Sequence, residues 1–281
     1  MPVSRSNRYL WLAILGAGLI IAVYIYVYAI QPLPGPWNAN FQALLISLAA
    51  LSAAVTATLN WRHFSPTDRG PRGVWGNFAL ALWLWVAAET IILIYTLLGI
   101  EPPLLSLADI FWVAAYVFFA GALIHQYRLV YRATRLQEMR VTLGIVGGIL
   151  ALSLVTTVLI QRFTPSNTTW FETLVTVLYP FMDLALGLAA LRLVYAFGGR
   201  LWSRPWMGLF VFALADTLYA WLEITGIYDA FVATGNPLSL VADAVYLAAY
   251  LVVAIACFST MLLLHYGLPP MAAPKPDSSP Q

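Results

Sequence analysis

Charged residues are scarce in this chain of 281 residues: they make up 9% of it, with 14 lysines and arginines and 12 aspartates and glutamates. A soluble domain carries about 25% charged residues, because most of its surface faces water. The shortage excludes a soluble globular enzyme, a disordered chain and a nucleic-acid-binding protein that works through a basic surface. Hydrophobic residues make up 62% of the chain instead, so we expect lipid to be its main solvent.

Cysteine and histidine are also rare, which limits the chemistry available to the chain. The single cysteine, Cys257, lies in an apolar run and excludes a disulfide framework and a thiolate metal cluster. Of the three histidines, His125 and His265 lie near the ends of apolar runs, and we interpret them as interfacial side chains rather than haem ligands. The sequence also lacks an HExxH zinc motif, a GxSxG motif and a glycine-rich phosphate loop. We therefore predict no metal site, and the sequence assigns neither catalytic residues nor a cofactor.

Long apolar runs dominate the sequence. A helix that crosses the hydrocarbon core needs about 20 apolar residues, whereas the strands of a membrane barrel have only about 10 and alternate in polarity. Eight runs predict an all-α polytopic membrane protein with transmembrane helices at residues 9–30, 41–60, 76–98, 107–127, 141–161, 171–195, 207–227 and 239–264. Proline-rich segments such as 31–36 and 101–103 separate some of these runs, because proline cannot continue a helix.

Basic residues gather on one side of the predicted spans. If the N-terminus is cytoplasmic, every one of the 14 lysines and arginines except Arg162 falls in a cytoplasmic end or loop. Membranes retain short basic loops on the cytoplasmic side. We therefore predict a multi-pass protein of the bacterial inner membrane with both termini cytoplasmic. Residues 1–8 form the N-terminal segment, and the proline- and serine-rich residues 266–281 form a disordered tail.

The two halves of the sequence resemble each other. Residues 78–81 and 212–215 both read Phe-Ala-Leu-Ala, and the same offset aligns Glu89 with Glu223 and Asp109 with Asp243. An even number of spans in each copy gives both copies the same orientation. We therefore predict two parallel four-helix repeats, 9–131 and 132–265, related by a pseudo-twofold axis along the membrane normal.

Several carboxylates lie within the predicted spans. An ionised carboxylate near the bilayer centre costs at least about 2.5–3.5 kcal/mol, so these side chains should face the interior of the bundle. Together with the aromatic residues on the same helix faces, they predict an outward-facing cavity lined by carboxylates and aromatic rings. The candidate ligand- or proton-binding residues are Glu89, Asp109, Trp112, Tyr116, Tyr179, Asp183, Asp216, Tyr219, Glu223, Asp243, Tyr246 and Tyr250.

Some of these acids also have a purely structural interpretation. Asp109 and Asp243 lie in the first turns of their predicted helices, where a carboxylate favours the helix dipole. Ser106 precedes Asp109 with the spacing of a capping pair. Glu89 and Glu223 are alternatively explained by hydrogen bonds between helices without a ligand.

Three short motifs resemble a known signalling module. The motifs are residues 105–112 with Tyr116, residues 240–246 with Tyr250, and Tyr179-Pro180 followed by Asp183. They are similar to the multi-span membrane input module that precedes diguanylate cyclase (GGDEF) and histidine kinase domains in bacterial and archaeal signalling proteins. The resemblance covers most of the eight predicted spans and implies a sensory membrane domain. The residues after His265 hold no output domain, so we expect an input module that works through a separate signalling partner or as a homodimer, a fragment of a longer protein, or the same fold reused for another purpose.

Besides a subunit of a larger membrane complex, the sequence leaves three functions open. We favour a sensory or ligand-binding module that is embedded in the lipid bilayer, signals through a separate partner and does not bind nucleic acid. One alternative is a proton-coupled transporter of small solutes, which the acids within the spans would suit. The other is an intramembrane lipid-modifying enzyme that uses Asp183, Asp216 and Glu223 as acid–base groups.

Overall fold

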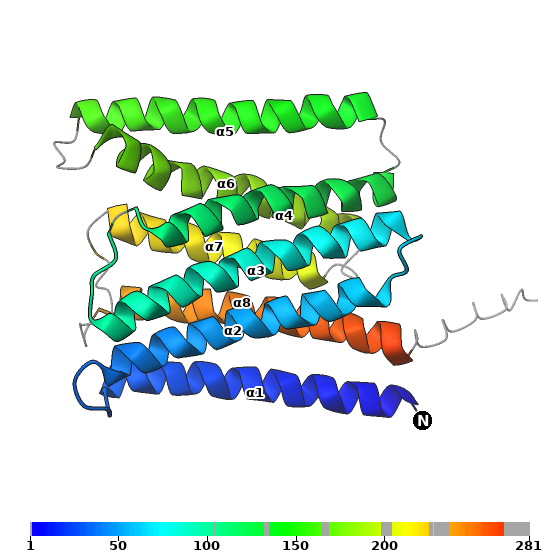
Figure 1. The fold of residues 1–281 in the computed structure, drawn as a ribbon, viewed down its shortest axis with the longest axis horizontal. Helices are drawn as coiled ribbons and strands as arrows, with labels where there is room; N and C mark the ends of the chain where they lie inside the picture. The colour runs from blue at the N-terminus through cyan, green and yellow to red at the C-terminus, as the bar shows by residue number, and fades with distance from the viewer. Residues whose placement is uncertain are drawn as a thin grey trace, which may run out of the picture.

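A computed structural model of the protein describes residues 2–103, 105–131, 135–163, 169–197, 204–224, 227 and 236–266. Within these ranges the chain forms eight α-helices and no strand, so the predicted all-α fold is confirmed (Figure 1). The helices are α1 (Pro2–Ile30), α2 (Trp37–His63), α3 (Arg69–Leu98), α4 (Leu107–Tyr131), α5 (Arg135–Phe163), α6 (Trp170–Ala196), α7 (Arg204–Ile224) and α8 (Pro237–Tyr266). Seven of the predicted spans fall within one of these helices each, and the eighth, 207–227, coincides with α7 up to its last residue, Ile224, while residues 225 and 226 lie outside the described part of the chain. Apart from Tyr266, the predicted tail 266–281 lies outside the described residues.

Seven of the helices are long and apolar enough to cross a membrane, namely α1 to α4 and α6 to α8. In α5, the described apolar stretch is the shorter segment Gly147–Arg162. The chain is therefore a multi-pass helical membrane protein with seven candidate spans, while an eighth span on α5 stays a prediction.

Local sequence sets the helix ends. Gly99 ends α3 with a φ of 66°, a left-handed conformation that glycine adopts without steric cost, and its N–H donates to the Thr96 carbonyl at 3.0 Å. At the start of α6, Thr169 and Glu172 form a capping box, in which each side chain accepts a hydrogen bond from the backbone N–H of the other residue. These caps satisfy backbone groups that would otherwise lie unpaired at the ends of the helices.

The helices run side by side along the long axis of the molecule, with α1 at one edge and α5 at the other (Figure 1). Helix α3 packs against α2 and α4, and α7 packs against α6 and α8. Contacts of α2 with α8, of α1 with α8 and of α4 with α6 join the first four helices to the last four. The interior of the bundle is therefore built mainly by α2, α3, α4, α6, α7 and α8, with buried side chains of α1 such as Tyr24 against α8.

Small residues line the buried face of α2, and aromatic residues fill the centre of the bundle. Helix α2 buries a stripe of alanines, which lets neighbouring helices approach closely: Ala49, Ala50, Ala53, Ala54 and Ala57. Large aromatic side chains fill the centre, where Phe78, Trp85, Phe119, Phe212 and Tyr250 are buried. The same aromatic residues surround the polar groups described below.

Gly208 marks a close approach of α7 to α8. A Cβ atom at this position would lie 3.1 Å from the Cα and 3.2 Å from the nitrogen of Val253, and backbone atoms cannot rotate away. We expect Gly208→Ala to lower the free energy of unfolding by about 1–3 kcal/mol through overpacking. The measurement is thermal unfolding of the protein purified in detergent.

Gly148→Ala is the matched control, because a Cβ atom at Gly148 meets nothing within 4 Å. It should leave the Tm unchanged or raise it slightly, since alanine favours the helix by about 1 kcal/mol over glycine. A Gly208→Ala protein that unfolds at the wild-type temperature would contradict the close packing of α7 on α8.

Candidate functional site

The carboxylate of Glu89 is buried on α3 and satisfied by two tyrosines of α8. Its Oε1 atom accepts hydrogen bonds from the hydroxyls of Tyr246 at 2.6 Å and Tyr250 at 2.8 Å. The two tyrosines are four residues apart and therefore share a helix face, with their hydroxyl oxygens 3.4 Å apart. A carboxylate in the first half of the chain thus takes its donors from the second half.

Two further tyrosine–carboxylate hydrogen bonds join α4 and α6, and each helix donates one of them. The hydroxyl of Tyr116 on α4 donates to Oδ1 of Asp183 on α6. The hydroxyl of Tyr179 on α6 donates to Oδ1 of Asp109 on α4 at 2.9 Å. Asp109 also caps its own helix, because its Oδ2 atom accepts from the backbone N–H of Ser106 at 2.7 Å. The structural interpretation of Asp109 as a helix cap is therefore confirmed.

Asp216, on α7, is a third acid close to these groups. It is partly buried and interacts electrostatically with both Asp183 and Glu89. Within the described part of the chain, Asp216 forms no hydrogen bond, and the buried Oδ2 atom of Asp183 has no partner. Acceptors therefore outnumber donors where α3, α6 and α7 meet.

We call this group the acid–tyrosine cluster and define it by Glu89, Asp183, Asp216, Tyr116, Tyr246 and Tyr250. The described histidines, cysteine, aspartates and glutamates form no group of three placed to hold a metal ion. Oxygen donors and acceptors are thus the chemistry that the cluster offers. It can bind a proton, a cation or a ligand that donates hydrogen bonds.

Trp85 contacts both the tyrosine that donates to Asp183, which is Tyr116, and one that donates to Glu89, which is Tyr250. Its ring stacks on Phe212 with centroids 4.1 Å apart and an interplanar angle of 26°. It also forms edge-to-face contacts with two tyrosines, with ring centroids 5.9 Å apart for Tyr250 and 6.5 Å apart for Tyr116. Sequence analysis did not single out Trp85, although its position four residues before Glu89 places both on one face of α3.

The remaining predicted residues lie around the cluster or apart from it. Trp112 lies near Glu89, and its buried indole nitrogen makes no hydrogen bond of normal geometry to the described residues. Tyr219 is partly buried on α7, whereas the side chain of Glu223 lies outside the described part of the structure.

Asp243 belongs to a polar site between α8 and α1, next to the acid–tyrosine cluster, because Tyr24 of α1 interacts electrostatically with both Asp243 and Glu89. It is buried and interacts electrostatically with Tyr24, which is itself fully buried. Sequence analysis missed this tyrosine, although Tyr24 and Tyr28 lie four residues apart in an apolar run and so share a face. The aligned acids Asp109 and Asp243 therefore have different surroundings.

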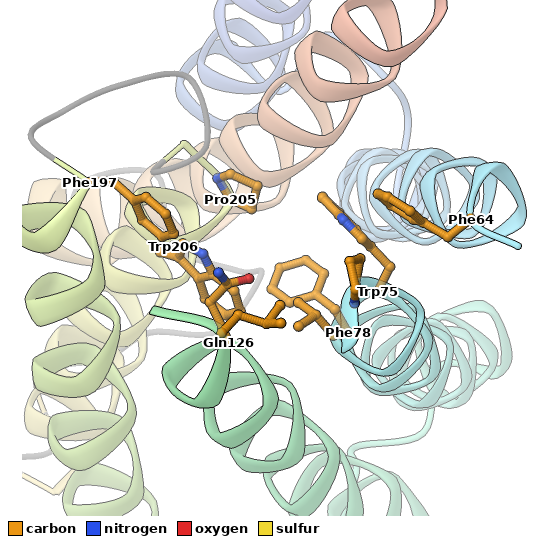
Figure 2. A pocket seen from close by; sticks show the side chains of 10 residues that line it. Phe64, Trp75, Phe78, Gln126, Phe197, Pro205 and Trp206 are labelled. Atoms are coloured by element: carbon orange, nitrogen blue, oxygen red, sulfur yellow. The ribbon is translucent and has the colours of Figure 1, made fainter. Parts of the chain in front are cut away.

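A cavity of about 190 Å³ lies at the opposite end of the bundle from Asp109 and Asp243 (Figure 2). It is lined where α2, α4 and α6 end and where α3 and α7 begin, and none of the cluster residues lines it. The outward-facing cavity that the sequence predicts around the acids stays a prediction.

Comparisons of the chain with models of protein families, with curated proteins and with solved structures give no match. The fold and the site therefore define the class of the protein on their own. It is a multi-pass helical membrane protein with buried carboxylates set in an aromatic core.

Removal of the Tyr116 hydroxyl tests its contact with Asp183. Tyr116→Phe should lower the free energy of unfolding by about 1–3 kcal/mol, because it deprives a buried carboxylate of its donor. The same substitution in an Asp183→Leu background should have a smaller effect, since the two side chains interact directly. Chemical unfolding in detergent micelles, followed by circular dichroism, measures both.

Tyr26→Phe serves as the control, because Tyr26 is 54% exposed on α1. It should change the free energy of unfolding by no more than about 0.5 kcal/mol. If the effects of Tyr116→Phe and Asp183→Leu simply add, the proposed contact is absent.

Proposed function

We propose that this protein is an integral membrane ligand-binding module of the sensory type, and that its ligand binds at the acid–tyrosine cluster. One observation carries the proposal: tyrosines of each half of the chain donate to carboxylates of the other half. A ligand that competes for these bonds would change how the two halves pack. Binding would thereby be converted into a change of shape.

The proposed ligand is a small organic ammonium compound. Asp216 and Oδ2 of Asp183 offer acceptors that no described donor satisfies. Trp85 and Phe212, whose rings stack on each other, lie one helical turn before Glu89 and Asp216 on the same helix faces, and aromatic rings attract cations. A positively charged ligand would complement both the acids and the rings.

The proposed output is contact with a separate signalling partner or with a second copy of the chain. The resemblance of the motifs around Asp109, Tyr179 and Asp243 to sensory input modules supports this output. In that mechanism, movement of α4 against α6, or of α8 against α3, would change the surface that the bundle presents at its ends.

The proposed architecture has eight spans in two parallel repeats, with both termini cytoplasmic in a bacterial inner membrane. Helix α5 runs alongside α6 in Figure 1, which supports its assignment as the eighth span. The packing of α2 on α8 has a weaker counterpart in the packing of α6 on α4, whereas the packing of α1 on α8 has no comparable counterpart between α5 and α4 among the described residues. The distribution of arginines supports the orientation.

A proton-coupled transporter is the second candidate function. The observation that favours it is the approach of three acids from α3, α6 and α7, whose described hydrogen-bond donors are tyrosines. Such acids can take up and release a proton together with a cationic solute.

Thermal unfolding in detergent with added tetramethylammonium or ethanolamine tests the proposed binding, with glycerol as the uncharged comparison. We expect the ammonium compounds to raise the Tm, because a ligand that binds only the folded state stabilises it. The rise should be lost in Glu89→Gln and retained in Glu101→Gln, since Glu101 is exposed beyond the end of α3. Equal unfolding temperatures with and without the ammonium compounds would contradict the proposed ligand class.

Proteoliposomes separate the binding module from the transporter. A pH gradient is imposed across the membrane, and tetramethylammonium, which carries no dissociable proton, is then added. The binding module predicts that the gradient decays as slowly as in liposomes without protein. Faster decay that Asp183→Asn abolishes would identify a transporter instead.

A further inference from the structure

We propose that the cavity at the opposite end of the bundle binds one acyl chain of an anionic phospholipid, whose phosphate is held by the arginines around the cavity. This site is separate from the acid–tyrosine cluster and does not depend on the function proposed for it. Its chemistry follows from the walls of the cavity, from the charge around it and from its place at the ends of the helices.

The walls of the cavity are apolar apart from Gln126, and half of the lining residues are aromatic. Figure 2 shows Phe64 and Trp75 on one side, Phe197 and Trp206 on the other, and Phe78 between them. An apolar cavity of about 150 Å³ is enough to bind benzene, so about 190 Å³ leaves room for a stretch of hydrocarbon chain. Burial of each methylene group contributes about 0.8 kcal/mol, which favours an acyl chain as the occupant.

Arginines lie next to lining residues of the cavity on three helices, α3, α4 and α7. Arg72, Arg128 and Arg204 are direct neighbours in the sequence of the lining residues Pro71, Leu129 and Pro205. The guanidinium of Arg72 donates to the backbone carbonyl of the lining residue Phe64 at 2.7 Å, which holds this charge at the cavity.

The same end of the bundle carries further positive charge from Arg62, Arg69 and Arg192. Asp68 is the only acid at this end whose side chain the structure describes. An anionic headgroup is therefore the complementary partner.

The position of the cavity favours a membrane lipid over a soluble anion. The cavity lies where five of the candidate spans begin or end, which is the level of a lipid headgroup in a spanning bundle. An apolar chain can enter the cavity from this level while the phosphate stays among the arginines.

Phosphatidylcholine can carry the same acyl chains as the anionic phosphatidylglycerol but has no net charge. A preference for phosphatidylglycerol over phosphatidylcholine therefore reports the role of the arginines.

Native mass spectrometry of the purified protein with phosphatidylglycerol or phosphatidylcholine tests the proposal. The wild-type protein should retain one phosphatidylglycerol more strongly than phosphatidylcholine. Val74→Phe places a larger side chain in the cavity, so that part of the acyl chain can no longer be buried there. Because the buried methylene groups of that part contribute to binding, retention should weaken by about tenfold or more. Val117→Phe is the matched control, because Val117 is 68% exposed on the outer face of α4.

A second pair of variants tests the headgroup without altering the cavity. Arg204→Gln should reduce the preference for phosphatidylglycerol, whereas Arg162→Gln, at the other end of the bundle, should not. The proposal is overturned if the wild-type protein retains no phosphatidylglycerol, or if Val74→Phe retains it as well as wild type does. It is also overturned if Arg204→Gln keeps the full preference.

Discussion

A carboxylate inside a membrane-spanning bundle must find hydrogen-bond donors, because neither water nor lipid supplies them there. In this protein tyrosine hydroxyls serve as donors, and they come from distant parts of the chain. Tyr246 and Tyr250 reach Glu89 from α8, and Tyr116 reaches Asp183 from α4. The requirement to satisfy these acids therefore constrains where α8 lies relative to α3, and how α4 packs on α6.

Aromatic packing gives this polar cluster a rigid frame. Phe78 contacts Phe119 with ring centroids 5.4 Å apart, and Phe119 contacts Trp85 at 4.5 Å. Phe78 also lines the cavity, so a continuous series of ring contacts leads from the cavity to the acid–tyrosine cluster. The two sites thus lie on one packed core, although they are at different levels of the bundle.

Apolar run length and proline placement were sufficient to predict the all-α fold and the positions of its helices. The energetic cost of an acid in lipid also placed Glu89 and Asp183 correctly in the interior. The pairing of acids with tyrosines could not be predicted, because it depends on which helices pack together. Asp109 and Asp243 align in the sequence, yet one contacts Tyr179 on α6 and the other interacts with Tyr24 on α1.

The cavity could not be predicted for the same reason. Its walls combine residues such as Phe64, Gln126 and Phe197, which lie far apart in the chain and share no motif. They come together because five helices begin or end at this level of the bundle. Short-range patterns therefore determined the helices, whereas both candidate sites arise from contacts between helices.

The central claim is that tyrosine–carboxylate bonds hold the two halves of the chain together. The most direct measurement uses the halves as separate chains, 1–131 and 132–281, that are co-expressed and purified through a tag on one of them. We expect them to co-purify, and the combined change of Tyr116, Tyr246 and Tyr250 to phenylalanine should separate them at a lower concentration of sodium dodecyl sulfate. The same change at the exposed Tyr9, Tyr26 and Tyr195 should have no such effect. Halves that separate at the same concentration with and without the three buried hydroxyls would contradict the account.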